Sequence, residues 1–126
     1  MIVGLGTDIV EIDRIEAHCK KSSRLAERVL TDAEMLVYTN HLHPARYLAK
    51  RFAAKEAAVK ALGTGIGNGI SWHHVEIKNN DLGQPQLHFS GEFARLCEER
   101  GVCSSAISIS DEKHYAVATV ILESAG

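Results

Sequence analysis

The sequence has 126 residues, of which 45% are hydrophobic, and a formal net charge of −2 at pH 7. This length predicts a single domain spanning residues 1–126, while the acidic balance argues against nucleic-acid binding. No apolar run approaches the roughly 20 residues of a membrane span, the N-terminus lacks a signal peptide's basic region, and three cysteines without C-x-x-C spacing indicate free thiols, so we expect a cytoplasmic protein.

Residues 2–12 alternate as a β-strand with two unlike faces. Val3, Leu5, Thr7 and Ile9 share one face. The other carries Gly4, Gly6 and Asp8. Two glycines beside an aspartate let another backbone or a ligand come close. The plainer alternative is a strand packed tightly under a helix, with Asp8 capping a turn.

Residues 13–30 predict a helix with a break near Ser22–Ser23, and basic side chains gather along it: Arg14, Lys21, Arg24 and Arg28. The spacing of Thr31 and Glu34 is a capping box that opens a short helix. Pro44 suits the first turn of a long helix that runs to Leu62 and ends at Gly63.

The second half of the chain is richer in strands. Strands are expected near 72–78 and 86–89, joined by a turn, followed by a helix from Ser90 to Gly101. The last strands, 106–110 and 115–122, are apolar on both faces, so we expect their sheet to be covered on both sides. The pattern predicts an α+β fold, a mostly antiparallel sheet packed against the long helix.

The stretch FAAKEAAVKALGTG, residues 52–65, places Glu56 and Lys60 one turn apart. Such a pair stabilises a helix by about 0.2–0.5 kcal/mol and is common on surfaces. Here it continues the stripe of Phe52, and a carboxylate and an ammonium beside apolar surface indicate a ligand site. The segment Gly63-Thr64-Gly65 could offer N–H groups and a hydroxyl to phosphate, although the lysine precedes the glycines and so excludes a P-loop.

Two carboxylates without thiolate or imidazole partners favour a hard cation. Asp8 and Glu56 could hold Mg²⁺ with few protein ligands, leaving positions for water and phosphate oxygens. The histidines occur in pairs such as His73-His74, but no cysteine or acidic residue completes a tetrahedral set at the usual spacing. We therefore predict magnesium and no zinc site.

Three motifs carry a resemblance to a known family: GLGTDIVEIDRI (residues 4–15), RFAAKEAAVKALGTGI (51–66) and SISDEKHYAVATV (108–120). With them the chain resembles the holo-[acyl-carrier-protein] synthase family of small 4′-phosphopantetheinyl transferases over nearly its whole length. The resemblance implies an enzyme of fatty-acid biosynthesis. Its partners would be coenzyme A, the donor of phosphopantetheine, and apo-acyl carrier protein, whose serine receives it as 3′,5′-ADP leaves. It also implies an α+β domain and a homotrimer with active sites between subunits.

The resemblance assigns roles to single residues. Asp8 and Glu56 match the Mg²⁺ ligands, and Lys60 matches the contact to the pyrophosphate. Glu56 and Lys60 are then the catalytic residues, although the sequence leaves open whether Glu56 is the general base or only a metal ligand. Coenzyme A phosphates would contact Arg51 and the loop Gly63, Thr64 and Gly65. The carrier protein would dock on Arg14, Lys21, Arg24 and Arg28.

Two positions depart from the family pattern. Some members have a histidine on a coenzyme A phosphate where this chain has Asp111, so we expect Asp111 to hold a neighbouring basic residue instead. Gln84 replaces a lysine common in the turn near the adenine, and Arg46 or Lys50 could compensate. The rival interpretation is a non-catalytic module that docks acidic carrier proteins, which would need neither Asp8 nor the Glu56–Lys60 pair.

Overall fold

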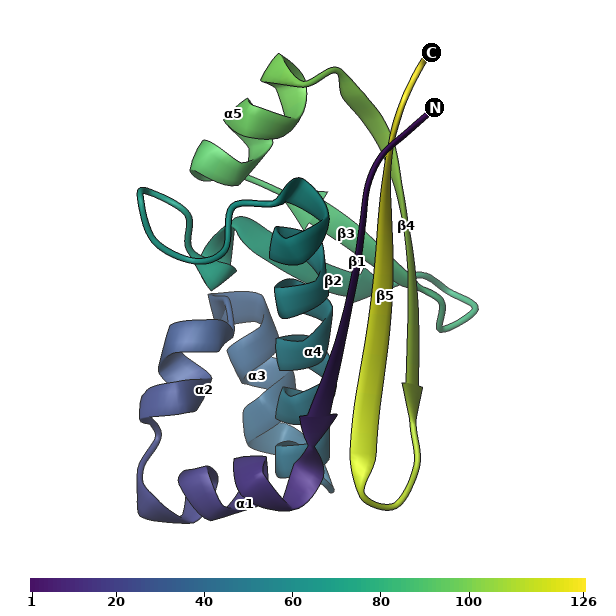
Figure 1. Cartoon of the computed structure of the whole chain (residues 1–126). Coiled ribbons are helices and arrows are strands. Elements are labelled where there is room, and N and C mark those ends of the chain that lie inside the picture. The colour runs from purple at the N-terminus through teal and green to yellow at the C-terminus, as the bar shows by residue number, and fades with distance from the viewer.

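A three-stranded antiparallel sheet joins the first and last segments of the chain. In the computed structural model, which describes residues 1–126, its order is β1-β5-β4, with β1 at Ile2–Glu11, β4 at Val102–Asp111 and β5 at Tyr115–Ser124 (Figure 1). The register sets Asp8 opposite Ala118 in β5. This arrangement confirms the predicted α+β class. Strands β4 and β5 extend beyond the ranges expected from sequence, while β1 ends one residue earlier than expected.

The long helix α4, Pro44–Leu62, packs against one face of this sheet. The approach is close because β1 presents Gly4 and Gly6 to it. A Cβ on Gly6 would lie 2.6 Å from Ala61 N and closer still to the carbonyl oxygen of Ala57. The small face of β1 therefore serves close backbone packing, and it brings the Asp8 segment directly beside α4.

The other helices lie on the same side of the sheet as α4 (Figure 1). The expected break divides the first helical segment into α1, Ile12–Lys21, and α2, Arg24–Val29. The capping box that opens α3, Asp32–Asn40, is confirmed. Helix α5, Gly91–Glu99, begins after Ser90 as expected, but the Ser90 side chain makes no capping bond. None of the helices combines the length and apolar character that a membrane crossing requires.

The segment predicted as a strand from residue 72 begins differently. Trp72–His74 forms the short 3-10 helix η1, and only then does β2, Val75–Asn79, pair with β3, Pro85–Phe89. The cause is local, because the hydroxyl of Ser71 accepts a bond from His73 N while Ser71 N donates to His74 Nδ1. These two bonds cap a helical turn and delay the strand.

The second face of the three-stranded sheet is uncovered within the chain, contrary to the expectation of cover on both sides. All helices pack on the α4 side, which the buried residues of β5 also face. The opposite side remains apolar, and Leu5 and Ile9 are 64% and 63% exposed. Their cross-strand partners in β5 are Ile121 and Val117, so the uncovered surface carries two apolar pairs, with the hydroxyl pair Thr7–Thr119 between them.

Candidate functional site

Lys60 of α4 pairs with Asp8 of β1. Its ammonium donates to Asp8 Oδ1 at 2.8 Å and to the carbonyl oxygen of Thr7 at 3.1 Å. No ion pair links Lys60 to Glu56 one turn away, although both residues lie on the same helix. The cross-element bond is available because Gly6 lets β1 approach α4. The ammonium side chain is still 55% exposed, which leaves it accessible from outside.

Glu56 is held from the opposite direction by Trp72. The indole Nε1 donates to Glu56 Oε2 at 3.2 Å, and the Trp72 ring lies 6.0 Å from the ring of Phe52, centroid to centroid. The sequence motifs assigned no role to Trp72. A lone tryptophan beside a glycine-rich loop was the only signal, and the hydrogen bond depends on the 3-10 turn that the sequence did not predict.

Asp8 and Glu56 line one shallow hollow of about 350 Å³. Its walls also include Arg14, Leu25 and Phe52. One oxygen of each carboxylate, Asp8 Oδ2 and Glu56 Oε1, accepts no hydrogen bond from the chain. Two such oxygens on two packed elements match the few carboxylate ligands that Mg²⁺ takes from a protein. No group of three or more His, Cys, Asp or Glu side chains gathers as a metal cluster.

Arg51 lies elsewhere, in a separate cavity of about 460 Å³. Its guanidinium stacks over the ring of Tyr47 at 4.8 Å, it is 7% exposed, and its Nε has no hydrogen-bond partner. Burial raises the pKa of Tyr47, and the nearby Arg51 charge opposes that rise. Arg51 and Glu56 are five residues apart, hence about 140° around the helix axis. A single chain therefore does not bring Arg51 into the Asp8–Glu56 hollow.

Asp111 holds the two basic neighbours that the sequence suggested. Its carboxylate lies 2.8 Å from Arg46 Nη1 and 3.4 Å from Lys50 Nζ. Partial burial alone would raise the pKa of Asp111, but the bonds to Arg46 and Lys50 outweigh it and lower the pKa below its ordinary value. The acid is thus neutralised by the cation pair that forms one wall of the Arg51 cavity.

The loop after α4 offers fewer free N–H groups than expected. Gly63 takes the left-handed conformation, with φ of 82°, and its N–H donates to the Val59 and Lys60 carbonyls. The Thr64 N–H also donates to Val59, and the Thr64 hydroxyl donates to Gly65 O at 3.0 Å. These bonds satisfy the carbonyls at the helix end, so the N–H groups of Gly63 and Thr64 are already used.

The predicted docking arginines and lysine are all exposed, on two consecutive helices: Arg14 and Lys21 on α1, Arg24 and Arg28 on α2. Arg14 lines the hollow that holds Asp8 and Glu56. Arg24 and Arg28 line a wider, open hollow whose other wall includes Trp72. Because Trp72 also bonds to Glu56, the basic surface reaches the edge of the candidate site.

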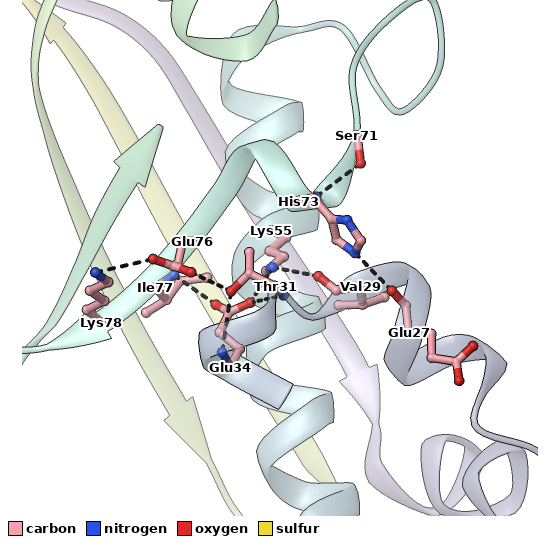
Figure 2. Close-up of polar contacts among 10 residues, drawn as sticks. All are labelled: Glu27, Val29, Thr31, Glu34, Lys55, Ser71, His73, Glu76, Ile77 and Lys78. Atoms are coloured by element: carbon pink, nitrogen blue, oxygen red, sulfur yellow. Dashed lines mark hydrogen bonds and ion pairs between the residues drawn. The ribbon is translucent and has the colours of Figure 1, made fainter. Parts of the chain in front are cut away.

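A buried ion pair lies on the inner side of α4. The Lys55 ammonium donates to Glu34 Oε1 and to the carbonyl oxygen of Val29, both at 2.6 Å (Figure 2). The side chains are 0% and 2% exposed. Burial lowers the pKa of Lys55, and the Glu34 carboxylate opposes that change. The sequence revealed Glu34 as half of a capping box but contained no sign of its partner.

Comparison with known proteins identifies the family to which this chain is similar. The family model of the 4′-phosphopantetheinyl transferase superfamily matches residues 4–120. A holo-[acyl-carrier-protein] synthase of Alteromonas mediterranea is 68% identical over 122 residues, covering 97% of each chain. The match therefore includes all three sequence motifs.

Comparison with solved structures gives the same family. The holo-[acyl-carrier-protein] synthase of Neisseria meningitidis superposes with a TM-score of 0.91 at 41% identity, covering 98% of this chain and 99% of its own. The synthase of Bacillus anthracis, in complex with CoA (3′,5′-ADP), gives a TM-score of 0.82 at 42% identity, covering 99% of both chains. At these identities and coverages the likeness extends to the whole fold.

Proposed function

The chain belongs to the 4′-phosphopantetheinyl transferase superfamily, and from that premise we propose that it transfers 4′-phosphopantetheine from coenzyme A to a serine of apo-acyl carrier protein. The products are holo-acyl carrier protein and 3′,5′-ADP. The names of the similar synthases and the ligand of the Bacillus anthracis structure support this substrate pair. Residues 1–126 would act as one domain, in the cytoplasm, in fatty-acid biosynthesis.

The convergence of Asp8, Glu56 and Lys60 carries the proposal. Two carboxylates with one free oxygen each share a hollow, and an exposed ammonium stands at one of them. This set fits a magnesium ion held by Asp8 and Glu56, with other positions left for phosphate oxygens. When bound there, Mg²⁺ would supply positive charge to the pyrophosphate of coenzyme A.

In the proposed reaction the serine oxygen bonds to the phosphorus that carries pantetheine. The bond from this phosphorus to the oxygen of the departing 3′,5′-ADP breaks. Glu56 takes up the serine proton through one water molecule. Lys60 turns from Asp8 to the pyrophosphate and stabilises the charge that grows on the leaving phosphate. Its 55% exposure supports such a rotation.

Arg51 and the loop Gly63, Thr64 and Gly65 are proposed to bind coenzyme A phosphates. The unpartnered Nε of Arg51 supports the first assignment, since a buried donor without a partner gains from an anionic acceptor. In the loop, the Gly65 N–H is the remaining donor, because the N–H groups of Gly63 and Thr64 are engaged and the Thr64 hydroxyl donates to Gly65 O.

The acidic carrier protein is proposed to dock on Arg14, Lys21, Arg24 and Arg28. These cations extend from the Asp8–Glu56 hollow to the Trp72 wall. A carrier that lies on them would hold its serine near Glu56. Complementary charge of this kind steers association and fixes orientation.

We also propose a homotrimer with active sites between subunits. The uncovered apolar face around Leu5 and Ile9 supports burial against other copies, since exposed apolar patches of this kind mark interaction surfaces. The separation of Arg51 from Glu56 within one chain supports a site completed by a neighbour.

The intact mass of apo-acyl carrier protein, measured after incubation with this chain, coenzyme A and Mg²⁺, tests the function. We expect a gain of one phosphopantetheinyl group, and no gain when EDTA is added. An unmodified carrier that still binds the chain would instead favour the non-catalytic docking module.

A further inference from the structure

Two bridges connect α2 to the helix that carries Glu56. In the first, Lys55 Nζ on α4 donates to the carbonyl oxygen of Val29, the last residue of α2. In the second, His73 Nε2 lies 2.9 Å from the carbonyl oxygen of Glu27, while the preceding residue, Trp72, donates to Glu56. Lys55 and Glu56 are adjacent in sequence, so the two bridges form a closed loop of contacts between α2 and one turn of α4.

Lys55 is the buried half of this loop. The last carbonyls of a helix have no partner within the helix, and the Lys55 ammonium supplies a donor to that of Val29. The same ammonium bonds Glu34, which accepts from Thr31 N at 3.0 Å and from Ile77 N of β2 at 2.9 Å (Figure 2). The end of α2, the start of α3 and strand β2 are thus all fixed to α4 through one nitrogen atom and its partner.

The position of α2 bears on the reaction because α2 carries Arg24 and Arg28. Adjacent residues of a helix point about 100° apart, so Lys55 enters the interior while Glu56 faces the hollow shared with Asp8. A shift of α2 relative to Lys55 therefore moves the two arginines relative to Glu56. Misplacement of bound groups by about 1 Å can cost up to about a hundredfold in rate.

We propose that Lys55 is a positioning residue. It fixes the position of the docking arginines of α2 relative to Glu56, and so determines where a bound carrier places its serine. This inference rests on the proposed function. The proposed role of Lys55 is distinct from stabilising the fold, because a buried ion pair can be replaced by apolar side chains at little cost in the free energy of unfolding.

Lys55→Met removes the ammonium while keeping a long apolar side chain. Glu34→Gln/Lys55→Met removes both charges, so it avoids a buried unpaired carboxylate while still leaving Val29 O without its donor. Lys55→Arg restores a cation. Arg95→Met is the matched control, since it removes an exposed cation that pairs with Glu99 at 3.0 Å on α5 and lies outside the Arg51 cavity.

Three quantities are measured on each full-length variant: melting temperature, amide hydrogen exchange of residues 24–30, and KM for carrier and for coenzyme A. We expect both Met variants at position 55 to exchange α2 amides about tenfold faster or more, and to raise the carrier KM about tenfold or more. The KM for coenzyme A should stay within about twofold in all variants. Lys55→Arg should recover part of the carrier KM, and Arg95→Met should match the wild type.

A double variant that regains wild-type melting temperature, α2 protection and carrier KM would overturn the proposal, because the pair would then only stabilise the fold. Should Lys55→Met fail to fold, the double variant decides in the same way. Hydrogen exchange needs no substrate. A wild-type chain without transfer activity therefore counts against the proposed function. Unchanged exchange of the α2 amides in the Met variants at position 55 counts against the positioning role of Lys55.

Discussion

Lys60 lies across from Asp8 and donates to its Oδ1 at 2.8 Å, although Glu56 is one helical turn away. Glu56 and Lys60, which have the spacing of an ordinary helix ion pair in the sequence, therefore bond to different partners. Lys60 faces strand β1, and Glu56 faces Trp72. Two carboxylates thus line a single hollow, and the Lys60 ammonium is bonded to one of them.

Glu56→Gln should lower phosphopantetheine transfer about a hundredfold or more while the fold is retained. The amide removes a metal-ligating charge and a proton acceptor but can still accept from Trp72. Intact mass of the carrier measures transfer, and circular dichroism measures folding. Glu99→Gln, on the exposed surface of α5, is the control and should behave as wild type. Wild-type turnover by Glu56→Gln would remove the metal and base roles together.

Reversal of charge at Arg14→Glu and Arg28→Glu should weaken carrier binding and make the remaining affinity less dependent on salt. Coenzyme A affinity should change less than carrier affinity, because neither side chain lies in the Arg51 cavity and only Arg14 lines the Asp8–Glu56 hollow. Titration calorimetry with carrier and, separately, with coenzyme A distinguishes these effects. Arg95→Glu on α5 reverses a charge far from α1 and should leave carrier binding intact (Figure 1); unchanged affinity in the double reversal would place docking elsewhere.

Gly6→Ala should lower the free energy of unfolding by roughly 2–4 kcal/mol. The new methyl group would press on the backbone of Ala57 and Ala61 and push β1, with Asp8, away from α4. Denaturant unfolding measures the change. Gly101→Ala is the comparison, since its φ of 74° is unfavourable for alanine but nothing lies within 4 Å of the added atom, so it should lose only about 1 kcal/mol. Equal losses would argue against close packing at Gly6.

Asp111→Asn should cost about 0.5–1 kcal/mol near neutral pH, the range of a partly exposed ion pair. The folded-state pKa of Asp111 lies below its ordinary value of 3.8. Its contribution is therefore present above that value and is lost as the pH falls through the folded-state pKa. Urea unfolding of both proteins should give curves that differ near neutral pH and converge in strong acid. A constant difference at all pH values would show that the charge is not the cause.

Leu5→Lys should convert the proposed trimer to single chains and reduce transfer, because it places a charge on the uncovered apolar face of the sheet. Mass by light scattering and the carrier assay, run on the same sample, measure both effects. Leu82→Lys, at the 93% exposed tip of the β2–β3 turn, is the matched control. An assembled Leu5→Lys protein would direct the search for the interface to another surface.

The sequence predicted features with strong local signals. The helix break at Ser22–Ser23, the capping box of Thr31 and the end of α4 at Gly63 each depend on a few adjacent residues, and all are confirmed. The family resemblance also singled out Asp8 and Glu56 by their motifs; the two residues line one hollow, and their metal role stays a prediction.

Contacts between distant segments could not be predicted from such local signals. The Lys55–Glu34 pair joins residues 21 positions apart, and no periodicity reveals that an alanine-rich helix buries a lysine. The Trp72 bond to Glu56 requires a 3-10 turn that a strand-like composition concealed. The expected cover on both sides of the sheet was wrong for this chain, since apolar side chains on a face do not show that any element packs on it, and Leu5 and Ile9 are exposed.

The pairing of the first strand with the last has a consequence for how the chain folds during synthesis. Ile2 is opposite Glu123, and the terminal ammonium of Met1 donates to Ser124 O at 2.8 Å. Strand β1 therefore finds its sheet partner only once β5, the last strand in chain order, has been synthesised. Contacts of such long sequence separation slow folding. The strand that carries Asp8 must wait for β5 before its pairing in the sheet is complete, so removal of β5 should leave Asp8 held less firmly, even though β1, α1, α2 and α4 supply the walls of the hollow.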